Sequence, residues 1–224
     1  IGKTNKKVLL FDELYQIVFE ESRRFDEITD EDGFPCEDIH ALTTWTRETF
    51  SRLLSDARFK IRAVNFSAYG ASFIYLDEGG EVMLPLYNYL KPFPAELQEK
   101  FYHKYGGREL VCRQTASPAL GSLNSGLQLY RIKYEDPELF SRIKYALHLP
   151  QYLSYVLSGS LHSEMTSIGC HTLLWDFEKM QYHDWVTKEE LADRFPGIKK
   201  AGSLAGYYQN EVKVGAGLHD SSAA

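Results

Sequence analysis

The two ends of the chain carry the residues best suited to chemistry. Near the start, a short segment holds glycine, hydroxyl, amide and ammonium groups, namely Gly2, Lys3, Thr4, Asn5, Lys6 and Lys7. Such a turn offers backbone N–H groups to a phosphate, and its lysines add positive charge. Near the other end, His219, Asp220 and Ser221 follow an apolar segment and a glycine-containing turn. A carboxylate placed there can take the proton from an attacking hydroxyl, so the two ends suggest two halves of a phosphoryl-transfer site.

Each of these signals has a structural alternative. A carboxylate after a strand often caps the next helix, and Asp220 could do so through the N–H groups of Ser222 or Ala223. Lys6 and Lys7 stand at the start of an apolar strand, where one of them could be only a solvated charge. We therefore expect phosphate contact from Thr4 and Asn5 before the lysines.

Composition restricts the class of protein and of partner. The 224 residues are 44% hydrophobic and 14% aromatic, enough for one large core or two modest ones. The 25 basic and 31 acidic residues give a net charge of −6, without a long basic run. Nucleic acid and anionic membrane surfaces are therefore poor partners, and a small neutral or anionic molecule is favoured. The sequence contains no apolar run of the roughly 18 residues that span a bilayer.

Three cysteines, Cys36, Cys112 and Cys170, lack the spacing of metal ligands. We expect unreactive thiols and no metal held by protein ligands, as suits a protein of the reducing cytoplasm.

The elements that must position the chain ends can be predicted from periodicity. Residues 6–12 and 15–20 form a β-hairpin, residues 22–35 a loop, residues 37–54 a helix and residues 61–66 a strand. A second hairpin pairs residues 72–77 with 82–84 around a glycine-rich turn. Further helices cover residues 95–105, 125–134, 151–157 and 188–194. Residues 201–206 are a flexible surface stretch before a terminal strand that starts at Val212.

Motifs spread over nearly the whole chain resemble, in order and spacing, the amino-terminal domain of FGGY carbohydrate kinases. They are the turn at 2–5, the Ser-Ala-Tyr-Gly-Ala-Ser-Phe segment at 67–73, Leu76-Asp77, Asn124 to Leu139, Leu149-Pro150-Gln151-Tyr152-Leu153, Glu164-Met165-Thr166-Ser167, Thr172 to Asp176 and Trp185. The segment at 69–73 and the ending at 217–222 look most like rhamnulokinase and fuculokinase members.

This resemblance implies an α/β fold of the actin-like ATPase or ribonuclease H-like type, with a mixed five-stranded sheet flanked by helices. Residues 1–224 would be the sugar-binding domain of a longer protein, and the nucleotide-binding domain would lie outside this chain. The activity it implies is transfer of the γ-phosphoryl group of ATP, with Mg²⁺, to a hydroxyl of a sugar or polyol, a ketose or deoxyketose. The protein would be cytoplasmic, and a homodimer is possible.

The resemblance also implies roles for single residues. Asp220 matches the general base, Gly70, His219 and Ser221 match sugar contacts, and Lys3 to Lys7 match the loop that faces the ATP phosphates. Tyr69 is either a core residue or a wall against which the sugar stacks. For Gly70, either a positive φ or the close approach of substrate would explain the glycine, and we expect close approach.

Some positions depart from the pattern and leave the substrate open. Ser72 stands where rhamnulokinase-like members have an acid, and Gln128 stands where many members have lysine. His171 lies near the sugar side, although a lone histidine is usually a packed or surface residue. A non-catalytic sugar-binding or regulatory relative of the same fold is therefore the alternative to a kinase.

Overall fold

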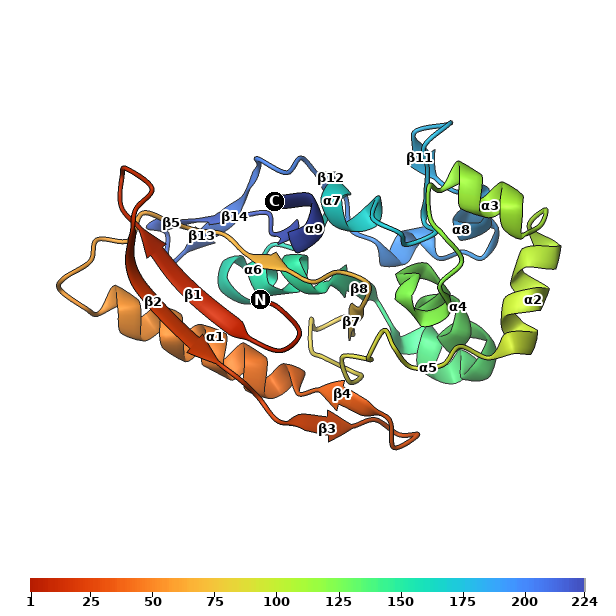
Figure 1. Cartoon of the computed structure of the whole chain (residues 1–224), viewed down its shortest axis with the longest axis horizontal. Helices are drawn as coiled ribbons and strands as arrows, with labels where there is room; N and C mark the ends of the chain where they lie inside the picture. The colour runs from red at the N-terminus through yellow and green to blue at the C-terminus, as the bar shows by residue number, and fades with distance from the viewer. Residues whose placement is uncertain (224) are drawn as a thin grey trace.

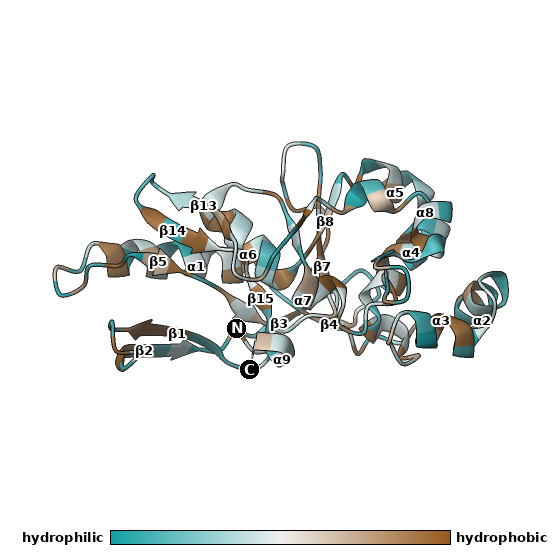
Figure 2. Cartoon of the chain, turned by 90° about the horizontal axis from the view of Figure 1, so that it is seen from above, coloured by the Kyte–Doolittle hydropathy of each residue, from teal (hydrophilic) through white to brown (hydrophobic). Residues whose placement is uncertain are grey.

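Most strands and the long helix at 39–54 lie at one end of the molecule, the helices between residues 95 and 142 lie at the other, and the two ends of the chain lie near each other in the middle (Figures 1 and 2). The computed structural model describes residues 1–223. The strands of the first third are β1 (Lys6–Phe11), β2 (Ile17–Arg23), β3 (Glu27–Thr29), β4 (Pro35–Glu37), β5 (Ala63–Val64), β6 (Ser67–Ala68) and β7 (Phe73–Leu76). Those of the remainder are β8 (Tyr145–His148), β9 (Ser163–Glu164), β10 (Trp175–Asp176), β11 (Gln181–Tyr182), β12 (Ile198–Lys199), β13 (Leu204–Tyr208), β14 (Val212–Gly215) and β15 (Leu218–His219).

The helices are α1 (Ile39–Leu54), α2 (Ala95–Lys104), α3 (Arg108–Gln114), α4 (Ser125–Glu135), α5 (Pro137–Arg142), α6 (Leu149–Ser158), α7 (Met165–Ile168), α8 (Asp184–Lys188) and α9 (Asp220–Ala223), with 3₁₀ turns at η1 (Gly121–Leu123) and η2 (Ala192–Arg194). Within residues 1–223, no helix combines the length and the apolar character needed to cross a membrane.

The first hairpin forms as predicted, with β1 antiparallel to β2. The following segment, predicted as a loop, instead contains a second hairpin of β3 and β4. Its turn is built by Asp30, whose carboxylate accepts the N–H groups of Asp32 (3.0 Å) and Phe34 (2.9 Å) and pairs with Lys91. The loop prediction was wrong because each strand of this hairpin is only three residues long, too short to show an alternating pattern beside the acidic turn.

Helix α1 confirms the predicted helix at 37–54. Asp38 caps it by accepting the N–H of Ala41 at 2.9 Å. Its buried face includes Leu42, Trp45 and Leu53, and the helix packs against α6.

β7 separates two cores by the alternation of its side chains. Phe73 and Tyr75 point into an aromatic core among the helices, whereas Ile74 and Leu76 point into an aliphatic core beneath α1 and α6. The partner of β7 along its length is β8, antiparallel. The predicted hairpin with residues 82–84 is present in a short form: Leu76 and Val82 make a bridge, and the N–H of Met83 donates to the carbonyl of Tyr75 at 2.9 Å.

The predicted five-stranded sheet is not found as one continuous ladder in the described residues, although the α/β character is confirmed. The largest sheet has three strands in the order β13-β14-β5, and β15 pairs with β6 in a separate parallel ladder. The two ladders are divided at Asn65, whose side chain accepts the N–H of Gly217 at 3.0 Å. A side-chain amide thus takes the place of a backbone partner where Gly217 turns at φ 72°.

Two predictions in the last third were wrong at their boundaries. In place of a helix at 188–194, α8 ends at Lys188 and η2 follows, because Glu190 adopts a left-handed φ of 55°. The stretch at 201–206, predicted as flexible surface, enters β13 at Leu204 and pairs with β14. The helices predicted at 95–105, 125–134 and 151–157 are confirmed by α2, α4 and α6.

Candidate functional site

One short segment, residues 67–69, holds both ends of the chain. The backbone nitrogen of Ile1 donates to the carbonyl of Ser67, and the Ile1 carbonyl accepts the N–H of Tyr69 at 3.1 Å. β6 of the same segment pairs with β15, so that Ala68 lies opposite His219. The fold therefore brings together the two segments that the sequence singled out (Figure 1).

Asp220 follows β15 directly and is the first residue of α9. Its side chain is 44% exposed, and its carboxylate accepts the N–H of Ser221 at 2.7 Å. Nε2 of His219 lies 3.8 Å from its Oδ1, and no lysine or arginine within residues 1–223 pairs with this carboxylate. The hydrogen bond goes to the next residue along the chain rather than to Ser222 or Ala223. This carboxylate is thus accessible and lightly engaged.

His219 is only 3% exposed. Its backbone N–H donates to the hydroxyl oxygen of Thr166 at 2.9 Å, and the Thr166 hydroxyl in turn donates to the carboxylate of Glu164. Its ring Nδ1 is buried without a hydrogen-bond partner in the described part of the chain. Burial lowers the pKa of His219, although the carboxylates of Asp220 and Glu164 act in the opposite direction. The imidazole is therefore a neutral ring at pH 7.

The ring of His219 explains why position 70 is a glycine. A Cβ at Gly70 would lie 2.2 Å from Cδ2 and 2.6 Å from Nε2 of that ring, and its φ is not in the left-handed region. Close packing rather than a positive φ thus explains this glycine, and the group that packs against it is a protein side chain. Whether a sugar also contacts Gly70 stays a prediction.

Tyr69 and Lys6 meet at one buried carboxylate, that of Glu37. The Tyr69 hydroxyl donates to Glu37 at 2.5 Å, and Lys6 Nζ lies 2.5 Å from its other oxygen, with the Lys6 side chain 3% exposed. Burial, with the neighbouring Glu37 charge, raises the pKa of Tyr69 well above its usual range. Tyr69 is thus a packed residue with a satisfied hydroxyl, and the Lys6 ammonium is held inside the domain.

The rest of the amino-terminal segment is at the surface. Thr4 and Asn5 are exposed in a turn closed by the Gly2 N–H and the Asn5 carbonyl at 3.0 Å. Lys7 is paired across the hairpin with Glu20 at 2.7 Å.

Lys3 ties this turn to the neighbouring segment at 88–89. Its Nζ donates to Asn88 Oδ1 at 2.7 Å and lies 4.8 Å from the centre of the Tyr89 ring.

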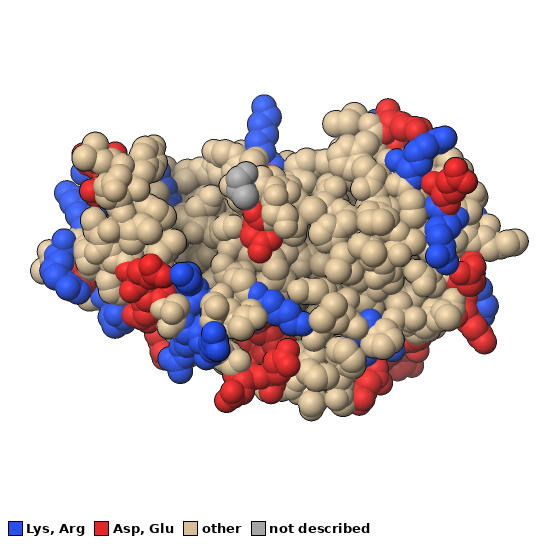
Figure 3. Space-filling model, viewed as in Figure 1, with Lys and Arg blue, Asp and Glu red and all other residues tan. Residues whose placement is uncertain are grey.

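The face of the molecule seen in Figure 3 carries lysine, arginine, aspartate and glutamate side chains of mixed sign, mainly around its rim.

Two positions that depart from the family pattern are buried. The Ser72 hydroxyl donates to the carbonyl of Tyr87 at 2.7 Å, and Gln128 Nε2 donates to the carbonyl of Ala71 at 2.6 Å. Both side chains brace the segment that follows Gly70.

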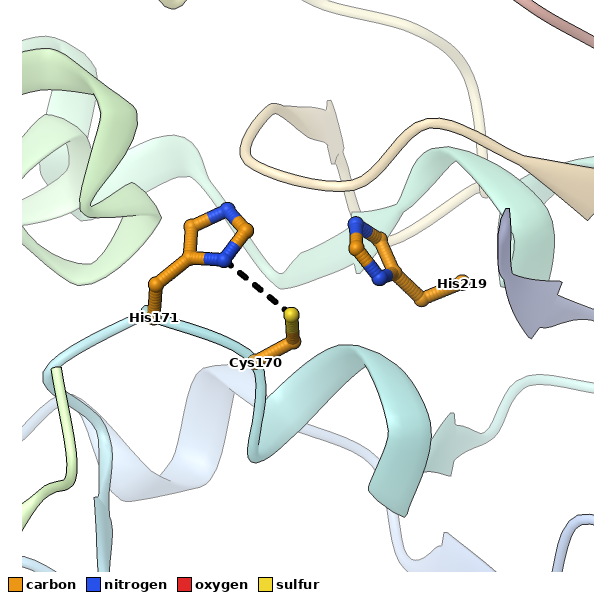
Figure 4. A group of neighbouring side chains, drawn as sticks. All are labelled: Cys170, His171 and His219. Carbon is orange, nitrogen blue, oxygen red and sulfur yellow. Dashed lines mark hydrogen bonds between the residues drawn. The ribbon is translucent and has the colours of Figure 1, made fainter. Parts of the chain in front are cut away.

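Cys170 lies close to two histidines, a grouping that the linear spacing of the cysteines did not predict. Cys170, His171 and His219 present one ligand atom each, all within 4.8 Å of one another (Figure 4). The linear spacing hid this group because His219 comes from β15, far along the chain. Glu164 and Thr166 were missed as site residues for the same reason, although the sequence did mark their motif.

Comparison with known proteins identifies the relatives of this chain. Residues 1–222 match the family described as the FGGY family of carbohydrate kinases, N-terminal domain. A rhamnulokinase of Mannheimia succiniciproducens is 25% identical over 235 residues, covering 100% of this chain and 47% of the relative. A xylulose kinase of Lactococcus lactis is 24% identical over 239 residues, with the same coverage of each protein. The chain thus spans about half the length of the curated relatives it matches.

The solved structure of a carbohydrate kinase from Novosphingobium aromaticivorans superposes with a TM-score of 0.86 at 26% identity, over 100% of this chain and 49% of that one. A ligand-bound xylulose kinase from Lactobacillus acidophilus gives a TM-score of 0.84 at 17% identity, covering 98% of this chain and 47% of that one. The second likeness concerns the fold alone.

Proposed function

Since the chain belongs to the FGGY family of carbohydrate kinases, we propose that it forms the sugar-binding domain of an enzyme that phosphorylates a sugar or polyol hydroxyl with ATP. The nucleotide-binding domain of that enzyme lies outside residues 1–224 in this proposal. The relatives named above are a rhamnulokinase and a xylulose kinase, which favours a ketose or deoxyketose as the acceptor.

The observation that carries the proposal is the state of Asp220. Phosphoryl transfer needs positioning, charge neutralisation and one acceptor for the hydroxyl proton. A carboxylate that is exposed and free of lysine or arginine partners within the described residues can serve as that acceptor. Asp220 is therefore assigned as the general base.

The surroundings of Asp220 supply sugar contacts. Ser221 offers a hydroxyl beside it, and His219 offers its ring at the base of the site. Gly70 packs on that ring, so a larger side chain at position 70 would displace the ring beside Asp220. Tyr69 contributes to the sugar site by holding the neighbouring Gly70 in place. Its hydroxyl is not free to bind sugar, because it donates to Glu37.

The amino-terminal turn faces the phosphates in this proposal. ATP, with Mg²⁺, supplies the transferred phosphoryl group when bound. The exposed hydroxyl of Thr4, the amide of Asn5 and the ammonium group of Lys3 are donors of the kind that phosphate oxygens accept. Lys6 and Lys7 contribute positive charge from their ion pairs rather than direct contact.

A turnover assay tests this function. A two-domain protein that contains this chain is screened for ADP release against a panel of ketoses and polyols, including rhamnulose and xylulose. The proposal expects sugar-dependent ADP release with at least one of them. Saturable sugar binding without ADP release would instead support the non-catalytic relative.

A further inference from the structure

We propose that Cys170, His171 and His219 form a binding site for a thiophilic divalent cation, with Zn²⁺ as the best-suited ion. The three residues come from two separate parts of the chain. Cys170 and His171 follow α7, whereas His219 ends β15. Figure 4 shows the two imidazole rings on opposite sides of the sulfur.

The ligand atoms are already close to the geometry of a metal site. Cys170 Sγ lies 3.0 Å from His171 Nδ1, and all three ligand atoms fall within 4.8 Å of one another. In a tetrahedral zinc site, bonds of about 2.0–2.3 Å place neighbouring ligand atoms about 3.5 Å apart. The observed separations, from 3.0 Å up to at most 4.8 Å, lie on either side of this value.

The burial of His219 is the second observation that points to a ligand. A ring that is 3% exposed, with Nδ1 lacking a hydrogen-bond partner among the described residues, forgoes an interaction that buried polar atoms nearly always make. Gly70 packs against the edge of this ring and the Thr166 hydroxyl holds its backbone, so the imidazole is fixed in place.

The donor set suits zinc chemically. One thiolate and two neutral imidazoles are borderline-soft ligands, and a fourth position stays open as in zinc sites with three protein ligands. Imidazole binds metal ions in its neutral form and cysteine in its thiolate form. The Cys170 thiol releases its proton to the solvent as the metal–sulfur bond forms.

Metal binding here would obstruct the sugar site, a consequence that rests on the proposed function. His219 precedes the assigned base Asp220 and lies against Gly70. An ion on this ring would lie beside the assigned base, so Zn²⁺ is expected to compete with the sugar and to inhibit the enzyme.

Cobalt titration tests the site without any sugar. The purified chain, freed of metal, is titrated with Co²⁺, whose thiolate-to-metal absorption reports a sulfur ligand. We expect one Co²⁺ per chain with this absorption, and its displacement by Zn²⁺. Cys170→Ser should abolish the absorption, and His171→Gln should weaken Co²⁺ binding at least 10-fold. The matched control, Cys112→Ser, should change neither, and thermal melts check that each variant is folded.

An absent thiolate absorption, or one that persists in Cys170→Ser, overturns the proposal. This readout is separate from the proposed function. If the chain binds no sugar, the cobalt signal is still expected; if the cobalt signal is absent, sugar binding is unaffected.

Discussion

Two carboxylates in this molecule, Glu189 among the helices and Asp220 at the joined chain ends, have opposite surroundings. Glu189 has a side chain only 2% exposed and accepts hydrogen bonds from four side chains, those of Lys104, Tyr105, Lys133 and Tyr134. Asp220 has a side chain 44% exposed and accepts only from the residue next to it, within the described part of the chain. A closed set of donors stabilises a fold, whereas an open carboxylate is free to take a proton.

The contrast extends to the neighbouring packing. The Glu189 centre lies on a cluster of aromatic rings, in which Phe101 stands 5.1 Å from both Tyr130 and Trp185. Around Asp220 the packing is fixed by single contacts, such as Gly70 against His219. Removing one contact around Glu189 should therefore lower the free energy of unfolding without changing activity. A substitution near Asp220 should instead change sugar binding or turnover.

The largest expected effect is on turnover. In the two-domain protein, Asp220→Asn should lower kcat by about 10²-fold or more, the usual scale for a lost general base, because the amide keeps the shape but cannot accept the proton. Sugar affinity should stay within several-fold. Steady-state kinetics with the best acceptor measure both. Near wild-type turnover would mean that Asp220 is only a surface residue.

The next effect concerns stability and its pH dependence. Burial by itself would raise the pKa of Glu189 above the 4.5 of a free glutamate. Hydrogen bonds from four side chains outweigh burial and lower this pKa to about 2; the donors are Lys104, Tyr105, Lys133 and Tyr134. Its stabilisation is therefore complete above pH 4.5 and is lost as the pH falls from 4.5 towards 2.

Accordingly, Glu189→Gln should lower the free energy of unfolding by about 3 kcal/mol at pH 7, and the difference from wild type should shrink near pH 3. Urea unfolding at both pH values measures this. A difference that is the same at pH 7 and pH 3 would remove the carboxylate charge from the explanation.

A smaller effect is expected from Gly70→Ala. The added Cβ forces the His219 ring to shift, and overpacking of this kind costs about 1–2 kcal/mol of unfolding free energy. Sugar affinity should fall as well, because the ring next to Asp220 moves. Thermal melts and sugar titrations on the same samples separate the two effects. An unchanged melting temperature would show that the ring is free to move away.

The smallest effect is on nucleotide use. In the two-domain protein, Thr4→Ala should raise the KM for ATP by about threefold, as expected for one lost hydrogen bond, with stability unchanged. Lys7→Met should have less effect, since the Lys7 ammonium is paired with Glu20. A larger rise in the KM for ATP in Lys7→Met than in Thr4→Ala would assign the phosphate contact to Lys7 instead of Thr4.

Local patterns in the sequence predicted a large part of this fold. The hairpin of β1 and β2 and the helix α1 follow from residue alternation and helical periodicity, which depend on near neighbours alone. The division of the sheet could not be predicted, because it depends on Asn65 meeting Gly217 from the other end of the chain.

The same limit applies to the site. The sequence indicated Asp220 and Gly70 through a family resemblance, but not that Gly70 packs on His219, or that Glu37 holds both Tyr69 and Lys6. These contacts join residues that are distant along the chain, so they cannot be predicted from the periodicity of the sequence.

The most direct test of the central claim, a sugar site at the joined chain ends, is a calorimetric titration of the chain with a panel of ketoses. Three proteins are compared: wild type, Gly70→Val, and the control Gly202→Val at an exposed glycine with nothing within 4 Å of an added Cβ. We expect saturable binding of at least one ketose to wild type and to Gly202→Val, and none to a folded Gly70→Val. Equal affinity in all three proteins would contradict the account.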